Sequence, residues 1–247
     1  MTNLPEMIRI PAGEFWMGSD PKRDPCAHER EQPQHRLYLP DYYLAKTPVT
    51  NAQYAAFVSD TGHAPPAHWA GGLPPPDKAD HPVVHVSWYD ALATCHWLAK
   101  VAGRPCRLPS EAEWEKGARG PDGRVHPWGD DWDTTRCNAK GSGVGDTTPV
   151  GAYPGGASPY GLLDMAGNVW EWTASLWGKE LKKAEFGYPY DPADGREQVD
   201  AANGVMRVLR GGAFYYDASY ARVACRLRSY PDYRVRTRGF RVCCGGE

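Results

Sequence analysis

Glycine and proline interrupt this chain so often that long helices and strands have little room. Together they account for 50 of the 247 residues, and both residues tend to end regular structure. The longest such stretch, residues 120–161, contains the isolated Trp128 and Trp132. Ordered loops of this length need aromatic side chains or a bound cation to hold them. Because the chain has ten tryptophans and 41% hydrophobic residues, we expect a loop-rich globular domain packed on aromatic side chains, not a disordered one.

Short elements with clear start or stop signals are expected between these interruptions. Three helices are predicted from N-cap residues, a capping box and terminal glycines, at residues 51–61, 88–101 and 111–119. Short apolar or alternating runs predict strands at residues 7–10, 14–17, 35–39, 42–46 and 83–86. The first two of these strands are expected to form a hairpin around the turn at Pro11 and Gly13. No linker divides the chain, so one domain over residues 1–247 is predicted.

Overall charge and cysteine usage exclude several classes of protein. The net charge is −2 and the isoelectric point about 6.4, which argues against a nucleic-acid-binding or membrane-surface protein. No apolar run is long enough to span a membrane and no signal peptide is visible, so the default compartment is the cytoplasm, with phage association or another export route left open. Seven cysteines without regular spacing argue against a disulfide framework, and Cys243 and Cys244 are expected to be core or exposed thiols.

The segment from Arg210 to Arg241 has the composition of a binding surface. Five tyrosines alternate in it with arginines, and tyrosine and arginine are enriched at binding hot spots and in antibody paratopes. Between residues 213 and 240 there is no Lys, Glu, Gln, Trp or Met, although these types make up 40 of the 247 residues, so about four or five are expected there. Those five types cannot be reached when the adenines of an AAC codon are randomised. Chance composition and deliberate diversification are the two explanations.

Several sequence blocks resemble the formylglycine-generating enzyme, or sulfatase-modifying factor, family. They occur in family order over nearly the whole chain, and the strongest is GLLDMAGNVWEW at residues 161–172. The others are IPAGEFWMGS at residues 10–19, PVTN at 48–51, HPV at 81–83, RLPSEAEWE at 107–115, PWG at 127–129, RGG at 210–212 and GFR at 239–241. The resemblance implies an α+β, C-type-lectin-like fold that is rich in loops, with two main helices packed on twisted antiparallel sheets.

The catalytic residues of the family are missing at the matching positions. Enzymes of this family that oxidise a sulfatase cysteine use two cysteines as a copper(I) site, and soft thiolates suit that ion. This chain has Tyr216 and Ala221 there, and Cys225 alone cannot form such a site. The related iron-dependent sulfoxide synthases take histidine ligands from an additional domain that this chain lacks. Neither copper nor iron is therefore expected, and a divergent enzyme or maturation factor using Cys225 or Arg226 is the alternative.

The resemblance is greatest to the variable proteins of diversity-generating retroelements, which are ligand-binding proteins without catalysis. Their C-terminal segment is rewritten by mutagenic reverse transcription at adenines, while a fixed frame supports it. The frame here corresponds to RGG at residues 210–212, Arg222, Arg226, Pro231 with Asp232, and GFR at residues 239–241. The expected partner is an unknown protein or surface ligand, bound by a monomer. The predicted ligand-binding residues are Phe214, Tyr215, Tyr216, Asp217, Ser219, Tyr220, Ala221, Val223, Leu227, Ser229, Tyr230, Tyr233, Val235 and Thr237.

A structural calcium ion is also implied by the resemblance. Asp164, Gly167, Val169 and Glu171 match family residues that offer two carboxylates and two main-chain carbonyls, and hard oxygen donors suit Ca²⁺. The alternative is that Asp164 caps a turn and Glu171 pairs with a core arginine. The basic, aromatic C-terminal segment could also stack on single-stranded nucleic acid, but nothing outside that segment is basic, which argues against this function.

Overall fold

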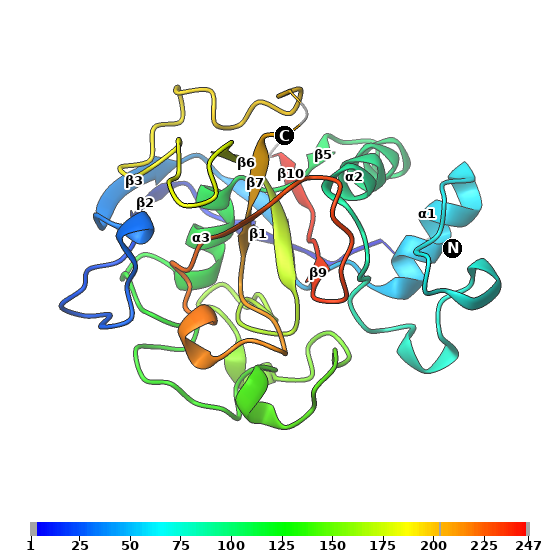
Figure 1. Ribbon diagram of the computed structural model, residues 1–247, viewed down its shortest axis with the longest axis horizontal. Helices are drawn as coiled ribbons and strands as arrows, with labels where there is room; N and C mark the ends of the chain where they lie inside the picture. Colours follow the sequence, from blue (N-terminus) through cyan, green and yellow to red (C-terminus); the bar gives the residue numbers. More distant parts are fainter. Residues whose placement is uncertain (1–3, 203, 246–247) are drawn as a thin grey trace.

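The computed structural model describes residues 4–202 and 204–245. Within these residues, three α-helices and ten strands are connected by long loops that include short 3-10 turns (Figure 1). The helices are α1 Asn51–Thr61, α2 Trp88–Ala102 and α3 Glu111–Arg119. The strands are β1 Met7–Ile10, β2 Gly13–Met17, β3 His35–Leu39, β4 Tyr42–Ala45, β5 Cys106–Arg107, β6 Trp170–Gly178, β7 Met206–Arg210, β8 Leu227–Ser229, β9 Arg238–Gly239 and β10 Cys243–Gly245. The predicted mixture of helices and antiparallel sheets is confirmed.

The helices begin and end where their capping residues are. Thr50, Ser87 and Ser110 each accept a hydrogen bond from the third helical residue in a capping box, which satisfies amide groups that would otherwise lack partners. Gly62 and Gly103 follow α1 and α2 in the left-handed conformation. All three helices predicted from local signals are confirmed. The family resemblance implied two main helices, and α3 is a third.

Three sheets organise the strands, and their pairing differs from the prediction. One sheet has the order β1-β4-β10-β5, a second pairs β2 with β3, and the third has the order β8-β7-β6-β9. The strands expected to form an N-terminal hairpin are present but belong to different sheets, so that prediction is wrong. Residues 83–86 form no strand either. The amide of Val83 donates to the carbonyl of Val49, but the segment is not part of a β-ladder. In both cases the chain pairs with segments distant in sequence.

A disulfide corrects the prediction made for the last two cysteines. Cys244 is bonded to Cys106 across a sequence separation of 138 residues. The bond forms because β10 lies between β4 and β5, with Cys244 directly opposite Cys106 in the ladder. Cys243 faces the other side, where it is a buried free thiol.

Strand β6 lies at the centre of the core. All nine of its residues are buried, and Trp170 and Trp172 belong to the largest hydrophobic cluster together with residues of α1 and α2. β6 pairs with β7 on one side and with β9 on the other, so the C-terminal segment is attached to both flanks of the core strand pair. No helix in the described part of the chain is long and apolar enough to cross a bilayer.

Candidate ligand-display face

The C-terminal segment leaves the core at the end of β7, where Arg210 is completely buried. Its guanidinium is paired with Glu115 of α3 and donates to the carbonyls of Val223 and Ala224 at 2.9 and 3.1 Å. Gly212 follows with φ of +78°, and a Cβ there would lie 2.8 Å from the carbonyl oxygen of Tyr220. The segment can fold back on itself only because this position has no side chain.

Two further arginines fasten the segment to distant parts of the fold. Arg222 donates to Asp24 at 2.5 Å and to Glu31 at 2.7 Å, and Arg226 donates to both oxygens of Glu111. Both guanidinium groups are buried. The arginines predicted as frame residues therefore hold the backbone of the segment from below, through partners that lie outside it.

The fourteen predicted ligand-binding residues divide into three groups by exposure. Tyr215 and Tyr233, at 62% and 50% exposure, and Asp217 are exposed. A second group is half-buried and consists of Tyr216, Ser219, Tyr220, Leu227, Tyr230, Val235 and Thr237. The last group is buried and consists of Phe214, Ala221, Val223 and Ser229. The ten residues of the first two groups, which we call the display residues, are accessible to a ligand.

Four of the predicted ligand-binding residues are buried in this structure, and their neighbours explain why. Val223 packs in the cluster of Trp114 and Leu162, and Ala221 in a cluster with Ala166. Phe214 lies beside β6 with its amide bonded to the carbonyl of Asn168, and Ser229 lies opposite Arg207 in the β7–β8 ladder. Because Arg222 and Arg226 turn inward to their carboxylates, residues close to them in sequence are drawn into the core.

The tyrosines gather in two clusters. In the first, the Tyr216 and Tyr220 rings lie 5.2 Å apart and both meet Trp170 edge-on, at 5.6 and 6.2 Å. In the second, Tyr230 and Tyr233 lie 5.5 Å apart and line a cavity of about 450 Å³. Tyr89 of α2 lines the same cavity. It lies outside the C-terminal segment, and no pattern in the sequence indicates its position there.

Three arginines of the segment have no carboxylate partner within residues 4–202 and 204–245. Arg236 is exposed over the rings of Phe214 and Tyr215, and Arg238 lies over Trp172. Arg228 lies over the Trp177 ring, and a buried nitrogen of Arg228 and one of Arg238 lack a hydrogen-bond partner among the described residues. By contrast, Arg234 pairs with Asp90 at 2.8 Å. The guanidinium groups of Arg228, Arg236 and Arg238 give the face a positive charge beside its tyrosines.

Of the residues predicted for calcium, Glu171 is already paired with a guanidinium. Arg241 donates to both oxygens of Glu171, at 2.6 and 2.7 Å, and the Trp114 indole donates to the same carboxylate at 2.8 Å. Asp164 accepts from the amide of Gly151 at 2.7 Å, and burial raises its pKa to about 6. The guanidinium of Arg241 thus neutralises Glu171 inside the core. No cluster of three or more His, Cys, Asp or Glu side chains suited to a metal occurs in the described ranges.

The thiol that could serve an enzymatic alternative is inaccessible. Cys225 is completely buried, and burial raises the pKa of its thiol to about 12. Since the thiolate is the reactive and metal-binding form, Cys225 is chemically quiet at neutral pH. Tyr216 and Ala221, which stand at the positions of the family's two cysteines, carry no thiol.

Comparison with known proteins extends over the whole chain. Residues 1–244 match the model of the sulfatase-modifying factor enzyme 1-like domain. The formylglycine-generating enzyme of Thermomonospora curvata is 33% identical over 95% of this chain and 92% of the relative. The serine/threonine-protein kinase Pkn1 of Chlamydia trachomatis is 37% identical over 96% of this chain but only 38% of the kinase.

Two solved structures share the fold. PvdO from Pseudomonas aeruginosa superimposes with a TM-score of 0.80 at 25% identity, covering 100% of this chain and 96% of that one. Treponema denticola variable protein 1 superimposes with a TM-score of 0.72 at 24% identity, covering 97% and 95%. The C-type-lectin-like fold of the formylglycine-generating-enzyme type, predicted from the sequence, is confirmed.

Proposed function

The chain belongs to the family of sulfatase-modifying factor enzyme 1-like domains, and on that premise we propose that it is a ligand-binding variable protein of a diversity-generating retroelement, without catalysis. In this proposal residues 210–241 carry the variable surface, and the remainder of the domain is its scaffold. Function has to be argued at the site, because the fold alone hosts more than one activity.

The observation that carries the proposal is the separation of frame and display residues. The frame arginines Arg210, Arg222 and Arg226 are held by carboxylates of other segments. The ten display residues have accessible side chains and belong to types reachable by randomising adenines in AAC. A scaffold fastened in this way can accept new residues at the accessible positions, because surface substitutions change stability by only about 0.5 kcal/mol.

The chemistry of the face favours an acidic protein surface as the partner. Tyrosine rings offer large contact area at low entropic cost, and Arg236 and Arg238 offer guanidinium groups that no carboxylate within residues 4–202 and 204–245 neutralises. Guanidinium groups bind carboxylates through paired hydrogen bonds. We expect binding to weaken at high salt, since the charges are solvent-accessible.

The test is the DNA next to the coding sequence. We expect a reverse-transcriptase gene and a near-copy of the codons for residues 210–241 that differs from them only where the copy has adenine. The differences should concentrate at the codons of the ten display residues and spare those of Arg222 and Arg226. Absence of such a copy, or differences spread equally over buried and accessible codons, would contradict the proposal.

A divergent enzyme is the second candidate, favoured by the 33% identity to a formylglycine-generating enzyme. Mass spectrometry of a cysteine-containing sulfatase peptide, incubated with the protein with and without copper, separates the two. We expect no aldehyde product, because Cys225 is buried and stands alone. Formation of the aldehyde would establish the enzyme instead.

A further inference from the structure

A second concave site lies away from the display residues, between α2, the start of α3, β6 and the loop that precedes β7. The cavity has a volume of about 280 Å³. None of the display residues lines it, so an inference drawn there goes beyond the proposed function. Its lining residues are Leu39, Trp88, Leu92, Arg107, Leu108, Ser110, Glu113, Ala174, Tyr190, Pro192, Glu197 and Val199.

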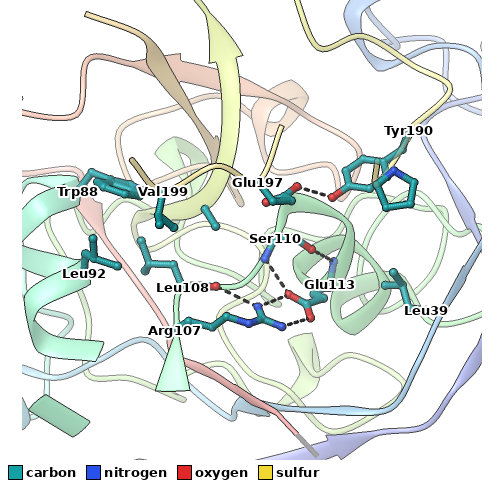
Figure 2. Close-up of a pocket in the computed structure, with 12 residues that line it drawn as sticks. Leu39, Trp88, Leu92, Arg107, Leu108, Ser110, Glu113, Tyr190, Glu197 and Val199 are labelled. Carbon is teal, nitrogen blue, oxygen red and sulfur yellow. Dashed lines mark hydrogen bonds and ion pairs between the residues drawn. The ribbon is translucent and has the colours of Figure 1, made fainter. Parts of the chain in front are cut away.

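The cavity has an apolar end and a polar end. Figure 2 shows Trp88, Leu92, Leu108 and Val199 gathered on one side, whereas Glu197 lies on the other side with Tyr190. Apolar walls with a few convergent polar groups are typical of small-molecule sites. A ligand that fits both ends has an apolar body and one polar group.

The polar group that this cavity would recognise is determined by Glu197. Its Oε1 accepts from the hydroxyls of Ser175, at 2.7 Å, and Tyr190. Its Oε2 is buried and has no hydrogen-bond partner within the described residues. A buried acceptor without a donor costs free energy that a ligand donor would recover. Burial also raises the pKa of Glu197 to about 7, as expected for a carboxylate removed from water.

The other charged groups near the cavity already have partners. Arg107 donates to both oxygens of Glu113 at 2.7 and 2.6 Å (Figure 2), so this pair adds no net charge. The buried guanidinium of Arg207 donates to the carbonyls of Ala174, Gln198 and Val199. Glu197 is therefore the lining carboxylate that still needs a donor.

We propose that this cavity binds a small organic cation, in which an ammonium group donates to Oε2 of Glu197 and an apolar body packs on Trp88 and Leu108. The ammonium supplies the missing hydrogen bond, and such charge-assisted bonds are stronger than neutral ones. The apolar body removes from water the side chains that line the opposite end.

Calorimetric titration with 2-phenylethylamine and with 2-phenylethanol tests the proposal. The two probes share the apolar body and differ in the group offered to Glu197. At about pH 8 the amine is protonated and Glu197 is ionised. We expect saturable binding of the amine and at least about tenfold weaker binding of the alcohol. No saturable binding of the amine, or equal affinity for both probes, would overturn the proposal without any variant being needed.

Two variants then locate the binding in this cavity. Glu197→Gln keeps the shape of the side chain and removes its charge, so it should weaken binding of the amine at least about tenfold. Val199→Trp, at an exposed lining position, should weaken both probes by narrowing the space. Glu180→Gln makes the same chemical change at an exposed carboxylate outside the cavity and should leave the affinity unchanged. Unchanged affinity in both Glu197→Gln and Val199→Trp would show that the probe binds elsewhere. These titrations do not involve the display residues, so their outcome is independent of the proposed function.

Discussion

Arg226 donates from Nε and Nη2 to the two carboxylate oxygens of Glu111, at 2.8 Å each, although the residues are 115 positions apart. Both side chains are completely buried. The guanidinium also lies 4.4 Å from the ring centroid of Tyr188. This pair joins the middle of the C-terminal segment to the first turn of α3, so the position of the display residues depends on a contact that no display residue makes.

Breaking that pair should destabilise the whole domain. In Arg226→Met the carboxylate of Glu111 loses its bidentate partner inside the core, and removal of one partner of a buried ion pair costs about 3–5 kcal/mol. Urea unfolding followed by tryptophan fluorescence measures the change. Arg9→Met is the matched control, because Arg9 pairs with Asp41 on the surface and such pairs contribute about 1 kcal/mol or less. An equal loss of unfolding free energy in the two variants would show that the buried pair contributes no more than the surface pair.

Chelation should leave the melting temperature unchanged. Arg241 already donates to both oxygens of Glu171, so a calcium ion would have to compete with a guanidinium for that carboxylate. A ligand that binds only the native state raises stability in proportion to its occupancy. Melting curves in EDTA and in added calcium are therefore expected to superimpose. A melting temperature that rises with calcium and falls with EDTA would restore the calcium site implied by the family resemblance.

Reduction of the Cys106–Cys244 disulfide should lower stability. The bond closes a loop of 138 residues, and cross-links of long loops stabilise by about 2–4 kcal/mol, chiefly through the unfolded chain. Thermal unfolding with and without reductant measures the effect, and the double variant Cys106→Ser/Cys244→Ser should reproduce the reduced protein. A reductant effect that persists in the double variant would have to arise from another cysteine.

Local signals in the sequence were sufficient for the helices but not for the sheets. Helix limits depend on neighbouring residues such as Thr50, Ser87 and Gly103, and these were predicted closely. Strand partners depend on segments far away in the chain. β10 enters between β4 and β5, and neither the disulfide nor the separation of β1 from β2 follows from any local pattern.

The candidate site was predictable in the same limited sense. The exposed Tyr215 and Tyr233 follow from composition, because tyrosine at high density is typical of binding surfaces. The burial of Val223 and Ala221 depends on where the arginines beside them find carboxylates, and Glu31 and Glu111 lie more than a hundred residues away. The cavity at Glu197 could not be predicted either, since its walls come from six separate parts of the chain.

The display tyrosines should contribute little to stability, whereas the frame phenylalanine should contribute much. Phe240 is completely buried in the largest core cluster, and truncation of a buried phenylalanine costs about 3–5 kcal/mol. Tyr215 and Tyr233 are exposed, so the double variant Tyr215→Ala/Tyr233→Ala should change stability by about 0.5 kcal/mol or less per residue. Tyr216→Ala should fall between these limits, at about 1 kcal/mol, because its ring meets Trp170 and Tyr220 and aromatic pairs contribute on that scale. Denaturant unfolding of the three variants gives the ranking. If the Tyr215/Tyr233 variant unfolds as readily as Phe240→Ala, these tyrosines are part of the core and the surface cannot tolerate the diversification proposed for it.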